Sequence, residues 1–149
     1  MIIEPDQHYY ENGKYVWTPE KRAAAWEKCF TVLEQEATSG KFKKIVMLIG
    51  IPGAGKSTYT KAHDSESTII FDGVFVNPKE RERAITIAHS TGLPIEGVWL
   101  NTPLEICLER NAQRTDDRKV REDHVTMMYE NLQKNKPRLE EGYTTFIEQ

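Results

Sequence analysis

The nine residues 50–58 read GIPGAGKST, which combines three glycines with an adjacent lysine and serine. The spacing Gly, four residues, Gly-Lys-Ser is that of a phosphate-binding P-loop, and the segment directly follows an apolar run, as such loops require. Glycines permit backbone angles that turn successive amides toward phosphate oxygens at the positive end of the next helix. The pattern therefore predicts a phosphate site, with a purely structural glycine turn as the alternative.

The residues of this loop have separate expected tasks. Lys56 is expected to reach the β- and γ-phosphates of ATP, and Ser57 to ligate Mg²⁺. The expected ATP-binding set is Gly53, Ala54, Gly55, Lys56, Ser57 and Thr58. Switches, motors and kinases all share this loop, so the motif alone does not choose among them.

Asp72 ends the β-favouring run 68–71. A carboxylate at the carboxyl end of a strand beside a P-loop can hold Mg²⁺ through water, which makes Asp72 a second candidate metal ligand after Ser57. An aspartate that caps a turn at Gly73 is the alternative.

Four arginines, at positions 110, 114, 118 and 121, fall within 12 residues. The first two are four apart, where like charges on a helix repel each other and an anion would relieve the repulsion. Guanidinium groups can follow the charge that builds up during phosphoryl transfer, so a lid near 110–121 has a use for them. A solvated basic helix end, balanced by nearby acidic residues, is the alternative.

The elements that must position these residues alternate between helix and strand. A helix begins at Thr18-Pro19 and ends at Ser39-Gly40, with an apolar stripe of Ala23, Trp26, Phe30, Leu33 and Ala37. Further strands are expected at 45–49, 68–71, 95–100 and 143–147, and further helices start at 56, 78 and 103 and include 125–132. This order predicts an α/β fold with a mostly parallel sheet of about five strands and helices on both faces.

Composition sets broad limits. A chain of 149 residues is expected to form one domain, residues 1–149, and no apolar run approaches the roughly 20 residues that cross a bilayer. Two cysteines and an N-terminus without a signal-peptide pattern favour a cytoplasmic protein with no membrane association. The formal charge of −3 disfavours general attraction to a polyanion, so any nucleic-acid contact must be local.

Two longer segments carry a resemblance to a known family. FDGVFVNPKERE and LNTPLEICLERNAQR resemble segments of the polynucleotide-kinase-like P-loop kinases, including an Arg-Asn-x-x-Arg signature at Arg110, Asn111 and Arg114. The likeness covers roughly residues 44–129. It implies a P-loop NTPase fold, ATP and Mg²⁺ as cofactors, contact of Arg114 with the transferring phosphate, and contact of Arg110 with the nucleotide.

The chain departs from that family in one respect. The family's acceptor strand, which carries the aspartate that activates the acceptor hydroxyl, lies between the P-loop helix and the Asp72-type strand, but only 14 residues separate Ser57 from Asp72 here. The N-terminal segment EPDQHYYENGKYVWTPEKRAAAWEKCF is similar to the acceptor unit instead. The chain thus resembles a circularly permuted member, with an acceptor side at 1–43 and a nucleotide-binding core at 44–149.

In that arrangement residues 1–4 form the acceptor strand, Asp6 is the general base, and Tyr9, Tyr10 and Tyr15 flank the acceptor. A kinase needs one carboxylate for the incoming hydroxyl and another near the metal, and Asp6 and Asp72 are the candidates. A solvated Asp6 near the chain end is the alternative, in which case Asp72 could itself be the base. His8 competes with Asp6 as an acid or base.

The expected function is transfer of the γ-phosphate of ATP to the 5′-hydroxyl of an RNA or DNA end, as in nucleic acid repair. A kinase for a nucleoside, sugar or antibiotic is the first alternative, which the acidic net charge favours. A nucleotide-binding switch is the second, although a switch has no evident need for an arginine lid. The sequence does not indicate an oligomeric state.

Overall fold

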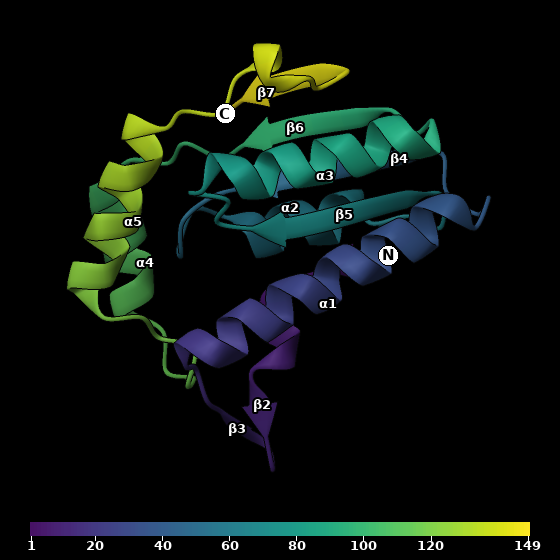
Figure 1. Ribbon diagram of the computed structural model, residues 1–149. Helices are drawn as coiled ribbons and strands as arrows, with labels where there is room; N and C mark the ends of the chain where they lie inside the picture. The colour runs from purple at the N-terminus through teal and green to yellow at the C-terminus, as the bar shows by residue number, and fades with distance from the viewer.

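A five-stranded parallel sheet forms the centre of the computed structural model, which describes residues 1–149 (Figure 1). The strand order is β1-β5-β4-β6-β7, and every neighbouring pair is parallel. The strands are β1 (Ile2–Ile3), β4 (Lys44–Ile49), β5 (Thr68–Gly73), β6 (Ile95–Trp99) and β7 (Thr145–Glu148). The predicted α/β fold with a five-stranded parallel sheet is confirmed.

The two central strands are buried on both faces. All residues of β5 are buried, and so are all residues of β4 except Lys44 at its start. A continuous apolar run suits a strand that is covered by helices on both sides, because no residue of it meets water. Asp72 is the exception in chemical type, since it is a carboxylate inside this buried layer.

Helices cover the sheet and one of its edges. In Figure 1, α1 (Pro19–Thr38) and α3 (Pro78–Thr91) lie side by side on one face, while α2 (Lys56–His63) lies on the other. The remaining two, α4 (Leu104–Ala112) and α5 (Glu122–Lys134), stand together at the carboxyl end of the strands. None of the helices is both long and apolar enough to span a bilayer.

The first strand lies at the edge of the sheet beside β5, with Ile2 opposite Ile70 and Ile3 opposite Phe71. The chain then forms a 3-10 helix, η1 (Pro5–His8), and a hairpin of β2 (Tyr10–Glu11) and β3 (Lys14–Tyr15). Helix α1 carries the chain across β5 to β4, as predicted for residues 19–38. The first residues of the chain are thereby placed next to β5, the strand that carries Asp72.

Local signals explain where the helices begin and end. The Thr18 side chain accepts a hydrogen bond from the Lys21 amide and caps α1, which was predicted from the Thr-Pro pair. Gly92 ends α3 with a φ of 77°, a left-handed angle that costs glycine little. A second 3-10 helix, η2 (Leu139–Glu141), precedes β7.

Two packing predictions were wrong. Ala23, assigned to the apolar stripe of α1, is exposed, and Ala25 and Cys29 are buried in addition to the residues from Trp26 onward. The first half of α1 packs against η1 as well as the sheet, so its buried face is wider and turned toward η1. A large aromatic such as Trp17 is expected in the core or in a groove, but Trp17 is 51% exposed beside the hairpin.

Candidate active site

The P-loop joins β4 to α2 and is shaped by two glycines with left-handed backbone angles. Gly53 has a φ of +85°, and a Cβ there would lie 2.6 Å from the carbonyl oxygen of Cys107 in α4. Gly55 has a φ of +106° and caps α2. The first amides of α2 have no acceptor within the helix, so they are available to an anion seated in the loop.

Lys56 is held at the centre of this loop. Its Nζ donates to the carbonyl oxygen of Gly50 at 2.7 Å and lies 3.9 Å from Oδ1 of Asp72. Ser57 follows at the start of α2 with its side chain exposed. Asp72 reaches the same place from β5, where it stands opposite Leu48 of β4. The P-loop lysine and the Asp72 carboxylate therefore lie together at the carboxyl end of the strands.

Asp72 carries less compensating positive charge than its burial requires. Burial raises its pKa to about 6, the Lys56 ammonium opposes this shift, and the carboxylates of Glu4 and Asp6 add to it. No group of three or more His, Cys, Asp or Glu side chains is arranged to hold a metal by itself. A buried and undercompensated carboxylate at the carboxyl end of a strand fits Mg²⁺ that also binds nucleotide phosphates, and Ser57 and Asp72 are the candidate protein ligands.

The N-terminal segment, the candidate acceptor side, also reaches the carboxyl end of the strands. Glu4 directly follows the β1 residue that pairs with Phe71, so Glu4 stands at the level of Asp72. Asp6 lies within η1, and its Oδ1 accepts a hydrogen bond of 3.1 Å from the Tyr15 hydroxyl. Burial and the Asp6 charge raise the pKa of Tyr15, so this phenol stays protonated and remains a donor at neutral pH.

The lid arginines divide among several tasks. Arg110 donates from Nη1 to the carbonyl oxygen of Gly53 at 3.0 Å, which places its guanidinium on the P-loop. The Nε of Arg114 lies 3.4 Å from Oδ1 of Asp116, so this side chain is paired within its own loop. Arg121 is exposed and pairs with Asp123.

Arg118 connects the lid to the acceptor side. Its Nη2 lies 3.6 Å from Oε1 of Glu4, and its guanidinium carbon lies 5.9 Å from the centre of the Tyr10 ring. The Tyr15 amide also donates to Asp117 at 3.2 Å. The residues between α4 and α5 thus contact the N-terminal segment, while Arg110 of α4 contacts the P-loop.

Buried Asn111 explains why this long connection keeps its shape. Its Nδ2 donates to the carbonyl oxygen of Val120 at 2.6 Å, and its Oδ1 accepts from the Val120 amide at 3.0 Å. The paired bonds close the segment 112–119 into a loop, which Lys119 reinforces by donating to the Ala112 carbonyl at 3.2 Å. Asn111 therefore shapes the connection between α4 and α5.

The structure brings most of the predicted site residues to the carboxyl end of the parallel strands. The P-loop residues 53–58, Asp72, Asp6 and Arg110 gather there, whereas Arg114 is turned toward Asp116. The sequence did not predict that Glu4 lies at the site or that Asn111 has a structural role. The register of β1 on β5 would have revealed Glu4, but two strand residues give no local signal for register.

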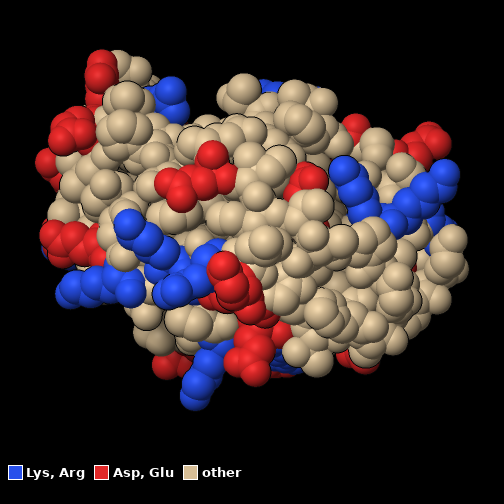
Figure 2. Space-filling model, turned by 90° about the horizontal axis from the view of Figure 1, so that it is seen from above, with Lys and Arg blue, Asp and Glu red and all other residues tan.

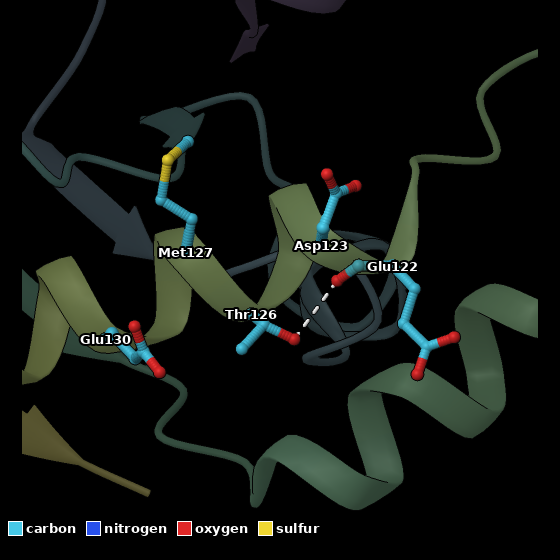
Figure 3. Close-up of a pocket in the computed structure, with 5 residues that line it drawn as sticks. All are labelled: Glu122, Asp123, Thr126, Met127 and Glu130. Carbon is cyan, nitrogen blue, oxygen red and sulfur yellow. Dashed lines mark hydrogen bonds between the residues drawn. The ribbon is translucent and has the colours of Figure 1, made fainter.

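One surface hollow lies away from the P-loop and is not the nucleotide site. It lies on α5 and has a volume of about 540 Å³. Figure 3 shows its five residues on one face of the helix, where Thr126 donates to the carbonyl oxygen of Glu122 at 3.1 Å. Three of the five are carboxylates and none is basic, so the hollow would repel a phosphate.

Comparison with known proteins agrees with the geometry. A family model described as an AAA domain matches residues 62–135, which is nearly half of the chain and extends from the end of α2 to the end of α5. This family includes polynucleotide-kinase-like and small-molecule kinases of the P-loop NTPase fold. The match therefore indicates nucleotide binding and ATP-dependent kinase activity, with the acceptor undetermined. No curated protein matches the chain.

Proposed function

We propose that this protein is a polynucleotide 5′-hydroxyl kinase that uses ATP and Mg²⁺. The observation that carries the proposal is the position of Asp6. It belongs to the N-terminal segment, two residues after Glu4, which stands level with Asp72, and its charge acts on the Asp72 carboxylate. A kinase needs a carboxylate that faces the incoming hydroxyl in addition to the carboxylate near the metal. Asp6 supplies the first and Asp72 the second.

The same placement supports a circular permutation of the acceptor unit. Only residues 64–67 join α2 to β5, so no strand and helix fit between them. The N-terminal residues supply a strand beside β5 instead, namely β1, which is followed in the chain by the tyrosine-bearing hairpin and α1. The family match begins at residue 62, after the P-loop, which is where the changed chain order would interrupt an alignment.

The proposed reaction uses the donor side to hold ATP and the acceptor side to activate the hydroxyl. The P-loop amides and Lys56 bind the β- and γ-phosphates, and Mg²⁺ at Ser57 and Asp72 would supply charge neutralisation there. The acceptor oxygen forms a bond to the γ-phosphorus as the bond to the bridging oxygen of ADP breaks. Asp6 takes the hydroxyl proton, while Tyr15 fixes the orientation of the Asp6 carboxylate.

Nucleic acid would be held by local cations and rings, not by a charged face. Figure 2 shows acidic and basic groups side by side on the face seen from above, around a broad neutral area. Near Asp6, in contrast, Arg118 lies over Tyr10, which is 43% exposed. An exposed ring beside a guanidinium is suited to one nucleotide at a strand end.

A small-molecule kinase is the second candidate, and the formal charge of −3 favours it because a nucleoside or sugar needs no basic surface. Incubation with γ-labelled ATP, Mg²⁺ and a panel of 5′-hydroxyl oligonucleotides, nucleosides and sugars separates the two. We expect label on the 5′ ends of oligonucleotides. Label on small molecules alone would refute the proposal, and binding of ATP without transfer to any acceptor would favour the switch.

A further inference from the structure

A second pocket, of about 350 Å³, lies between η1 and the first turns of α1. Its polar lining is formed by Gln7, His8, Tyr10, Lys21 and Lys28, and two alanines of α1 complete the wall. None of these residues has a part in binding ATP. The pocket is therefore separate from the P-loop and belongs to the acceptor-side segment.

The lining is made of hydrogen-bond donors and cations. The Lys21 ammonium is buried, and its one acidic partner is Glu11, 2.5 Å away, whose side chain is 60% exposed. Lys28 is exposed and forms no ion pair. Burial and the Lys28 charge lower the pKa of His8, so its imidazole is neutral at pH 7 and keeps one N–H. A singly charged anion complements this set better than a cation or an apolar group.

The pocket is one aromatic ring away from the candidate base. Gln7 and His8 directly follow Asp6 in η1. The Tyr10 ring, which lines the pocket, lies 5.5 Å from the ring of Tyr15 in an edge-to-face arrangement, and the Tyr15 hydroxyl donates to Asp6. A strand whose 5′-hydroxyl meets Asp6 would thus pass Tyr10 before it reaches the two lysines.

We propose that this pocket holds an internucleotide phosphate downstream of the 5′-hydroxyl nucleotide, with Tyr10 packed against the intervening nucleoside. The inference rests on the proposed kinase function and specifies its substrate class, namely an acceptor of at least two nucleotides. The contact is made by the ground-state acceptor and is kept in the transition state. Its loss should therefore raise KM for the acceptor and leave kcat largely unchanged.

The test uses 5′-hydroxyl oligonucleotides in which one linkage at a time, from the first to the third, is a neutral methylphosphonate. With the unmodified protein, we expect one of these substitutions to raise KM by about tenfold, the size typical of a lost charge-assisted contact. Lys28→Ala should raise KM for the all-phosphate strand by a similar factor. In this variant, a methylphosphonate at the sensitive linkage should cause no further rise in KM. Lys41→Ala, at an exposed site before β4, is the matched control and should behave as the unmodified protein.

Lys21→Ala gives a second reading at the same pocket and should also remove the methylphosphonate effect. Undiminished sensitivity in both lysine variants, or no sensitive linkage in the unmodified protein, would overturn the inference while the kinase function stood. Failure of the unmodified protein to phosphorylate any oligonucleotide would refute the kinase function and this inference together. The two failures are thus told apart by the unmodified protein alone.

Discussion

The donor side and the acceptor side of this molecule are built by different means. The donor side consists of consecutive residues on one loop, which follows a strand buried from Ile45 to Ile49 and is shaped by two left-handed glycines. The acceptor side consists of side chains from η1 and the hairpin, fixed by contacts with a loop more than 100 residues later in the chain. The candidate nucleotide site thus rests on a local motif, whereas tertiary contacts place Asp6, the proposed general base.

The sharpest test of the donor side is Lys56→Ala. Loss of the ammonium removes charge stabilisation from the transferring phosphate, so we expect kcat to fall by about 10³-fold or more. Lys61→Ala, on the exposed side of the same helix, should leave kcat unchanged. Transfer of label from γ-labelled ATP measures both variants. A Lys56→Ala protein with more than a tenth of normal turnover would contradict the role given to the loop.

The acceptor side is tested by Asp6→Asn. A general base contributes roughly 10²- to 10⁴-fold, so kcat should fall by about 10²-fold or more. The affinity for ATP, measured by titration, should stay the same because Asp6 does not contact the P-loop. Glu66→Gln, at an exposed site before β5, serves as the control. Near-normal transfer by the Asp6→Asn protein would assign the base to another residue, with Asp72 the next candidate.

Arg114 tests whether the lid changes between the free and the working state. In the structure it pairs with Asp116, yet the family resemblance gives it the transferring phosphate. Should it turn to that phosphate, Arg114→Ala will lower kcat by about 10²-fold. Arg121→Ala, the exposed arginine of the same segment, should have no effect. Equal activity of the two variants would leave Arg110 as the arginine that acts on the nucleotide.

The smallest effect concerns stability and comes from Asp72. Its folded-state pKa of about 6 lies above the ordinary value of 3.8, so the folded protein binds a proton that the unfolded chain releases between these values. Stability in the absence of ligand should therefore fall as the pH rises from about 4 to 6. Asp72→Asn should raise the free energy of unfolding at pH 7 by about 1 to 3 kcal/mol. Thermal unfolding at pH 4 should show a smaller gain; an equal gain at both pH values would contradict this origin.

Sequence reasoning succeeded where neighbouring residues suffice. The alternation of elements, the loop between β4 and α2, and the strand that carries Asp72 all depend on local patterns, and the structure has them. The direction of Arg114 and the position of Glu4 depend on pairings between distant segments, which composition and spacing do not encode. Trp17 illustrates the same limit, because a large aromatic is usually buried but this one follows a hairpin that projects from the sheet.

The short strand β1 has a consequence for how the protein folds. It adds only two residues to the sheet, and its partner β5 lies beyond α1, β4 and α2 in the chain, so its pairing closes a long loop for a small gain. We expect β4, β5 and β6 to assemble first and β1 to dock late. Pulse-labelled hydrogen exchange during refolding would then protect the Ile70 amide, which donates to the Met1 carbonyl, after the amides that pair β4 with β6. In that order, the P-loop forms before Asp6, the proposed general base, reaches its place.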